Sequence, residues 1–176
     1  NENIAGAVVG TLSIPGAGLG TPTTPLASLS LSVLDGSNGF RLDGVDADDY
    51  SGYSVSSAGD VNGDGFDDVI IGAIGADPGG KSNAGESYVV FGKGSGFSAD
   101  LDLSSLDGSN GFRLDGVDAD DYSGFSVSSA GDVNGDGFDD VIIGAYGAAP
   151  DDQWGVGESY VVFGKSSGFS SSLDLS

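Results

Sequence analysis

Two nine-residue segments of identical sequence, DVNGDGFDD, concentrate oxygen-bearing side chains at residues 60–68 and 132–140. Carboxylate, amide and carbonyl oxygens are the ligands that Ca²⁺ prefers, usually about six to eight of them in a flexible shell. Four carboxylates within nine residues repel one another unless a cation neutralises them. The segments therefore predict a cation site each, for Ca²⁺ rather than Mg²⁺, because Mg²⁺ favours rigid octahedral sites that keep several waters.

The predicted ligands alternate along each segment, at positions 1, 3, 5, 7 and 9. In the first copy they are Asp60, Asn62, Asp64, the main-chain carbonyl of Phe66, and Asp68. In the second copy they are Asp132, Asn134, Asp136, the carbonyl of Phe138, and Asp140. Gly63 and Gly65 permit the tight backbone wrapping, including positive φ, that such a loop requires. Asp67 and Asp139 stay outside the predicted ligand set.

The segments allow two other interpretations, an EF-hand and a solvated turn. An EF-hand needs Glu at loop position 12, where this chain has Ile71 and Ile143, and no helix is predicted on either side. A solvated Asp/Gly turn is the remaining alternative, and its occurrence in two perfect copies counts against it.

Composition narrows the classes of function. The chain of 176 residues carries a net charge of −22, which disfavours nucleic acid and anionic membrane surfaces as partners and favours cations. It has no Cys and no His, so disulfides, thiolate metal sites and the commonest catalytic bases are absent. Glycine stands at 33 residues, which with few helix formers predicts an all-β fold.

Localisation follows from weaker signals. No apolar run approaches the roughly 20 residues of a membrane helix, so no membrane insertion is expected. The first residue is Asn1 rather than Met, which suggests a mature product or a fragment. An Asp-rich, Gly-rich chain without Cys suggests an extracellular or cell-surface protein of bacterial type.

The chain contains an internal duplication. Residues 35–76 and 107–148 align with a shift of 72 residues (107 minus 35) and differ at two positions only, 53/125 and 74/146. After a variable patch the identity resumes at 85–93 and 157–165. The variable patch is therefore predicted to be a loop tip, because loops tolerate change better than packed strands.

Each repeat predicts four short antiparallel strands. In the first repeat three of them are 51–59, 67–73 and 86–92, which are alternating or continuous runs of β-branched and aromatic residues. A fourth fits GFRLDG, at 39–44 and again at 111–116. A small sheet that is apolar on both faces must be sandwiched between neighbours, as the blade of a β-propeller is.

The positions at which the repeats start and stop predict that a strand is exchanged between neighbouring copies. The last repeat ends without a GFRLDG strand, while a spare one stands at 39–44. Two blades cannot close a ring, so the chain is either an excerpt of a longer repeat protein or a unit that joins identical copies head to tail. We expect residues 1–32 to be an N-terminal strand and linker, possible donor to a neighbour, followed by repeats at 33–104 and 105–176.

The string SGFSVSSAGDVNGDGFDDVIIGA followed by GESYVVFG resembles the FG-GAP repeat of the integrin α-chain β-propeller and its bacterial relatives. The resemblance covers residues 39–169 and implies Ca²⁺ bound in a loop between the first two strands of each blade. The chain departs from the family pattern at 51–52 and 123–124, which are Ser-Gly instead of Phe-Gly. It also holds two blades, whereas integrin propellers are seven-bladed.

Two functions remain open. The first is a Ca²⁺-stabilised structural or adhesive protein that self-assembles head to tail into a homo-oligomer, ring or filament. The alternative is a ligand-binding module, a fragment of a larger adhesin, that recognises a protein or glycan through loops such as 77–84. No enzyme is predicted.

Overall fold

The structure is a computed structural model that describes residues 30–153 and 155–176. Most of the predicted donor segment 1–32 therefore lies outside the described residues. The chain divides into two units, Asn1–Leu31 and Ser32–Ser176, and the second holds all ten strands of the described residues. No helix in the described part is long and apolar enough to cross a membrane. The helical segments there are single 3-10 turns: η1 (Leu31–Val33), η2 (Pro78–Gly80), η3 (Leu103–Ser105) and η4 (Pro150–Asp152).

The first blade is a five-stranded sheet with the order β10-β6-β4-β3-β2. The four strands of the predicted meander pair antiparallel, and β10 adds to β6 in parallel. The fold is thus all-β with propeller-type blades, as the sequence predicts. The strands are β2 (Ser51–Gly59), β3 (Asp68–Ala73), β4 (Glu86–Val90), β6 (Gly111–Asp115) and β10 (Ser172–Asp174).

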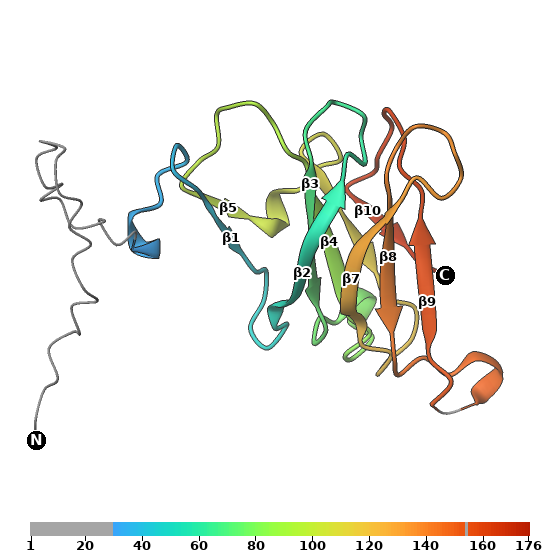
Figure 1. Cartoon of the computed structure of the whole chain (residues 1–176). Helices are drawn as coiled ribbons and strands as arrows, with labels where there is room; N and C mark the ends of the chain where they lie inside the picture. The colour runs from blue at the N-terminus through green and yellow to red at the C-terminus, as the bar shows by residue number, and fades with distance from the viewer. Residues whose placement is uncertain (1–29, 154) are drawn as a thin grey trace, which may run out of the picture. The chain divides into compact units, whose positions relative to one another are not determined.

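The second blade contains three strands, β7 (Ser123–Gly131), β8 (Asp140–Ala145) and β9 (Glu158–Val162), with β9 at the edge. No described residue supplies a fourth strand to this blade, in agreement with the absence of a GFRLDG segment from the end of the last repeat. The spare strand β1 (Arg41–Asp43) instead pairs in parallel with β5 (Asp100–Asp102). In Figure 1 the β1–β5 pair and β9 lie on opposite sides of this unit.

The main core lies between the two blades. Blade 1 contributes Ile70 and Val89 from its central strands and Phe112 and Leu114 from β6, all at most 2% exposed. Blade 2 contributes the buried Val141 and Ile143 of β8. A second core on the other side of blade 1 is closed by η3 and by the β1–β5 pair, with the members Ile71, Ala73, Ala76, Tyr88, Val90, Leu103, Leu106, Leu42 and Leu101.

Identical residues have different environments in the two blades. Val89 and Phe91 are 0% and 8% exposed in blade 1, whereas their counterparts Val161 and Phe163 are 43% and 53% exposed. The prediction of strands covered on both faces therefore holds for β4, holds for β3 and β8 except at the exposed Val69 and Ile142, and fails for β9. The reason is that blade 2 covers one face of blade 1, and nothing in the described chain covers the corresponding face of blade 2.

All five Lys and Arg side chains make contacts within the fold. Arg41 pairs with Asp43, and Arg113 pairs with Asp115 and with Glu86. The three lysines are also engaged, with Lys93 over the ring of Phe97, Lys165 over the ring of Phe169, and the Lys81 ammonium donating to the Val117 carbonyl.

The repeat supplies a matched test of this packing. Phe112→Ala removes a ring that is 2% exposed and packs in the inter-blade core, so it should lower the free energy of unfolding by about 3–5 kcal/mol. Phe40→Ala removes the equivalent ring, which is half-buried and stacks on Phe97 alone, and should cost only about 0.5–1.5 kcal/mol. Urea denaturation measures both, and equal losses would contradict the asymmetric core.

Candidate metal centres

The two acidic loops join equivalent strands. Residues 60–68 connect β2 to β3, and residues 132–140 connect β7 to β8. Both loops leave the sheets at the same end of the strands, the upper end in Figure 1. In each blade the long Ser-rich first strand is thus joined to the shorter apolar second strand by a loop made mostly of Asp, Asn and Gly.

Asp60 organises the first loop through its carboxylate. One oxygen, Oδ1, accepts hydrogen bonds from the N–H groups of Gly63 (2.7 Å) and Asp64 (3.0 Å), and Oδ2 accepts from the N–H of Gly65 (2.9 Å). Gly63 and Gly65 have φ of +74° and +88°, which confirms the positive φ expected there. The backbone wraps around one carboxylate because glycine tolerates this conformation without steric cost.

Asn62 and Asp64 continue the same pattern. The Asn62 Oδ1 accepts from the Asp64 N–H (2.9 Å), and its Nδ2 donates to Asp64 Oδ2 (3.1 Å). The other oxygen of Asp64 accepts from the Phe66 N–H (2.9 Å). Side chains at positions 1, 3 and 5 therefore share one short turn, with their oxygens held by backbone and amide donors.

Asp68 anchors the loop to the sheet. Its side chain is 1% exposed, with Oδ2 accepting from the Val61 N–H (2.9 Å) and Oδ1 from the Gly92 N–H (2.8 Å). Burial raises the pKa of Asp68 to about 6, although the two N–H donors act in the opposite direction. A buried carboxylate with two backbone donors and no cationic side chain is costly alone and favourable beside a bound cation.

The second loop repeats this geometry. Asp132 accepts from the N–H groups of Gly135, Asp136 and Gly137, at 2.7, 3.0 and 2.9 Å. Asn134 and Asp136 bond to each other, and the Phe138 N–H donates to Asp136. Asp140 is 0% exposed, and its carboxylate accepts hydrogen bonds from the N–H groups of Val133 and Gly164.

In each loop the predicted ligands lie within one short turn. Their side chains do not converge on a common point that could hold a metal ion. Among the described residues, no group of three or more Asp, Glu, His or Cys side chains lies close enough to hold a metal ion. The carboxylates face the backbone donors of their own turn instead. The ligand sets around Asp60 and Asp132 accordingly stay predictions.

Asp139, which the sequence leaves without a role, connects the two loops. Its Oδ2 accepts from the Asp60 N–H (2.9 Å), and its own N–H donates to the Asp60 carbonyl (3.1 Å). The Lys165 N–H adds a bond to the Val61 carbonyl (3.0 Å). The carboxylate of Asp139 in one loop thus accepts a hydrogen bond from Asp60, the first predicted ligand of the other loop, and these residues are 79 apart in the sequence.

The loop at 77–84, a predicted ligand-recognition loop, is occupied by the following repeat. The carbonyls of Ser82, Asn83 and Ala84 accept from the N–H groups of Asp120, Tyr122 and Ser123 (2.8–3.0 Å). The Asn83 amide also donates to the Asp120 carboxylate (3.1 Å). These bonds make the loop a connection between repeats.

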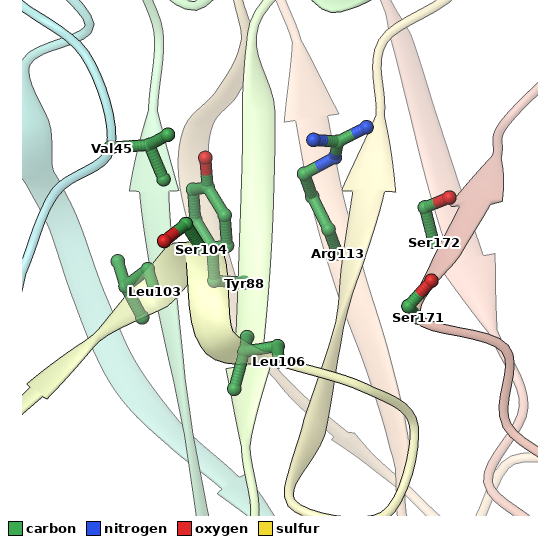
Figure 2. Close-up of a pocket in the computed structure, with 8 residues that line it drawn as sticks. All are labelled: Val45, Tyr88, Leu103, Ser104, Leu106, Arg113, Ser171 and Ser172. Carbon is green, nitrogen blue, oxygen red and sulfur yellow. The ribbon is translucent and has the colours of Figure 1, made fainter.

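A cavity of about 190 Å³ lies beside blade 1 (Figure 2). Two of its largest polar side chains are already paired, since the Tyr88 hydroxyl donates to Glu86 and the Arg113 guanidinium pairs with Asp115. Its volume lies below the roughly 300–1,000 Å³ of small-molecule sites. The lining residues are Val45, Tyr88, Leu103, Ser104, Leu106, Arg113, Ser171 and Ser172.

Asp139 and Asp67 form a matched pair for a stability test. Asp139→Ala leaves the partly buried Asp60 N–H without its acceptor and should lower the free energy of unfolding by about 1–3 kcal/mol. Asp67, at the equivalent position, is exposed and has no side-chain hydrogen bond in the described part of the chain. Asp67→Ala should therefore stay within about 0.5 kcal/mol of the wild type. Urea denaturation of dilute, monomeric protein at one Ca²⁺ concentration distinguishes the two, and equal effects would refute the inter-loop role.

Known proteins similar to this chain are integrin α subunits. It is 32% identical over 135 residues to integrin alpha-PS2 of Drosophila melanogaster, covering 74% of this chain and 9% of that protein. It is 37% identical over 95 residues to integrin alpha pat-2 of Caenorhabditis elegans and 34% over 102 residues to integrin alpha-IIb of Mus musculus, covering 54% and 56% of this chain. The chain spans only 7–9% of these relatives.

The FG-GAP repeat family matches residues 51–90 and 123–162. The two matches begin with β2 and β7 and end with β4 and β9, so each covers three strands of a blade together with one acidic loop. The two blades of this chain are FG-GAP repeats of the integrin α type.

Proposed function

We propose that this chain is a Ca²⁺-stabilised, extracellular structural or adhesive repeat module that assembles with further copies of itself. The observation that carries the proposal is the pair of identical oxygen-lined loops, each at the same end of an FG-GAP blade and bonded to each other through Asp139 and Asp60. The role is non-enzymatic and requires no catalytic group.

The donor set fits Ca²⁺ in its chemistry. Each loop offers only oxygen ligands, from Asp60, Asn62, Asp64, the Phe66 carbonyl and Asp68 in the first copy, and no Lys or Arg side chain neutralises them. Every carboxylate oxygen that accepts one N–H bond keeps a lone pair for a cation. Bound Ca²⁺ would offset the repulsion among these carboxylates and the burial of Asp68, so it would stabilise the folded loop specifically.

The second loop offers the same donors, from Asp132, Asn134, Asp136, the Phe138 carbonyl and Asp140. Because Asp139 bonds to Asp60, a cation in either loop also steadies the contact between the blades. We therefore propose that Ca²⁺ has a structural role and stabilises the orientation of one blade relative to the other.

Self-assembly is supported by the unequal ends of the folded unit. The edge of β9 has no strand partner among the described residues, and β1 has a partner on one side only. Exposed strand edges invite the addition of another strand. Head-to-tail joining of this kind builds a ring when the rotation closes and a filament when it does not.

The second candidate function is a ligand-binding module within a larger integrin-like adhesin. The similarity to integrin α subunits, of which the chain spans 7–9%, supports it. The loop at 77–84 is a poor recognition element for this role, because the next repeat occupies three of its carbonyls. A protein or glycan would have to contact other loops.

Ca²⁺ binding is tested by calorimetric titration with a charge-matched control. The wild-type chain should bind two Ca²⁺, Asp60→Asn one, and Asp67→Asn, which removes the same charge from the same loop outside the ligand set, two. Each occupied site should add about 2.7 kcal/mol of stability at a hundredfold excess over its Kd, and EDTA should remove the gain. A melting temperature that is indifferent to EDTA would exclude the structural role of Ca²⁺.

Self-assembly is tested by light scattering of the full chain over a range of protein concentrations. The mean mass should rise above that of one chain as concentration increases. A chain that stays monomeric throughout would favour the ligand-binding alternative, for which no assembly is needed.

A further inference from the structure

Within the chain, the two sequence repeats are joined by the pairing of β4 with β6, called the internal joint, and both of its segments occur twice in the sequence. Strand β4 (ESYVV) pairs antiparallel with β6 (GFRLD) in the register Glu86 to Asp115 through Val90 to Gly111. The same five letters as β4 form β9, and the same five letters as β6 stand at 39–43, which include β1. The first pair is joined, whereas the second pair lies apart with both facing edges open in the described residues.

We propose that β1 of one copy adds antiparallel to β9 of another copy in the register of the internal joint, with Glu158 opposite Asp43 and Tyr160 opposite Arg41. This inference rests on the self-assembly proposed above and identifies the two surfaces that carry it. The occupant of the β9 edge is thus a second copy of this chain, because the matching strand is already folded at the other side of each unit (Figure 1).

The charges at the joint support this register. In the internal joint the Arg113 guanidinium contacts Asp115 on its own strand and Glu86 on β4 (3.5 Å), and the Tyr88 hydroxyl donates to Glu86. Burial raises the pKa of Glu86, and the neighbouring Arg113 partly offsets this. A buried carboxylate and a cation from different strands thus compensate each other.

Equivalents of these four side chains lie on the two unpaired strands, two on β9 and two on β1. On β9 the Tyr160 hydroxyl donates to Glu158, and on β1 Arg41 pairs with Asp43. The Arg41 side chain is 65% exposed, against 37% for Arg113. Joining β1 to β9 reunites the carboxylate of Glu158 with the guanidinium of a second copy.

Aromatic packing gives a second, independent match. In the internal joint Phe91 packs edge-on against Phe169 (5.2 Å between ring centroids) and against Phe112 (5.9 Å), and Phe112 and Phe169 stack (4.8 Å). The equivalent stack of Phe40 on Phe97 (4.5 Å) is already formed beside β1.

The Phe40–Phe97 stack lacks the third ring that Phe91 provides in the internal joint. The counterpart of Phe91 is Phe163, which follows β9 in the second repeat. Phe163 is 53% exposed. In the proposed joint Phe163 of one copy completes the Phe40–Phe97 stack of the next. The exposed Val161 of the same edge is covered in the way that Val89 is covered inside the chain.

Cysteine cross-linking tests the register without background, since the chain has no Cys. Tyr88 and Arg113 are directly opposite in the internal register, and opposed residues on adjacent antiparallel strands are close enough for a disulfide. The Arg41→Cys/Tyr160→Cys chain of residues 1–176, oxidised and run without reductant, should give a ladder of covalent multimers. Mass spectrometry should find residues 41 and 160 joined.

Two controls fix the interpretation. Arg113→Cys/Tyr88→Cys, the same pair inside one chain, should close a disulfide within the monomer and give no ladder. Leu42→Cys/Tyr160→Cys shifts the register by one residue and turns the first thiol to the opposite face of the sheet, so it should give no ladder.

A variant without new cysteines keeps the test independent of disulfide geometry. Phe163→Ser should fold, because the ring is largely exposed, and should reduce the fraction of multimers in light scattering at least tenfold. Val156→Ser, which removes a side chain 58% exposed elsewhere in the same repeat, should leave that fraction unchanged.

The outcomes separate this inference from self-assembly as such. Wild-type multimers with no ladder from the in-register pair, or with equal ladders from both pairs, overturn the proposed register and leave self-assembly standing. Wild-type protein that remains monomeric at every concentration removes both.

Discussion

The backbone pairing of β4 with β6 holds together a blade whose strands come from both sequence repeats. Five residue pairs form this contact, and through it Phe112 and Leu114 enter the core between the blades. Neither repeat makes a complete sheet of its own, because β6 follows β5 and η3 in the chain and yet closes the sheet that begins at β2. Stability of the first blade therefore depends on residues of the second repeat.

The acidic loops contribute to this arrangement through hydrogen bonds as well as charge. Asp60 and Asp132 each draw three backbone N–H groups into one turn, and Asp68 and Asp140 fasten that turn to the end of the neighbouring strand. The loops are thus ordered by their own carboxylates. Asp139 then transmits the position of one loop to the next, so the orientation of the blades and the shape of the loops are mechanically linked.

Local features of the fold could be predicted from the sequence because they depend on local properties. The sequence predicts strand β2 at its observed bounds, and the positive φ at Gly63 follows from the loop pattern. The three-residue strands β5 and β10 were missed, since DLD and SLD are too short to show any period and pair only with a distant partner.

The contacts and burial that arise where one blade packs on the other could not be predicted from the sequence. The bond from Asp60 to Asp139 joins identical loops, so no difference in sequence marks it. The burial of Val89 and the exposure of Val161 arise in identical pentapeptides, and only the presence or absence of a covering blade distinguishes them. The same holds for the predicted Ca²⁺ ligands. The sequence identifies residues with suitable oxygen atoms, but whether those atoms surround one point depends on the three-dimensional structure.

The five basic side chains have a consequence for the protein as a colloid. Each is engaged in a contact within the fold, on a carboxylate, an aromatic ring or a carbonyl, while the chain carries 27 acidic residues. The outer surface is therefore a polyelectrolyte of nearly one sign, surrounded by a dense counterion atmosphere. Its effective size and mutual repulsion shrink as salt compresses the Debye length, which is about 30 Å in 0.01 M salt and about 3 Å in 1 M salt. Dilute media keep such molecules apart, and salt-rich media let their surfaces approach.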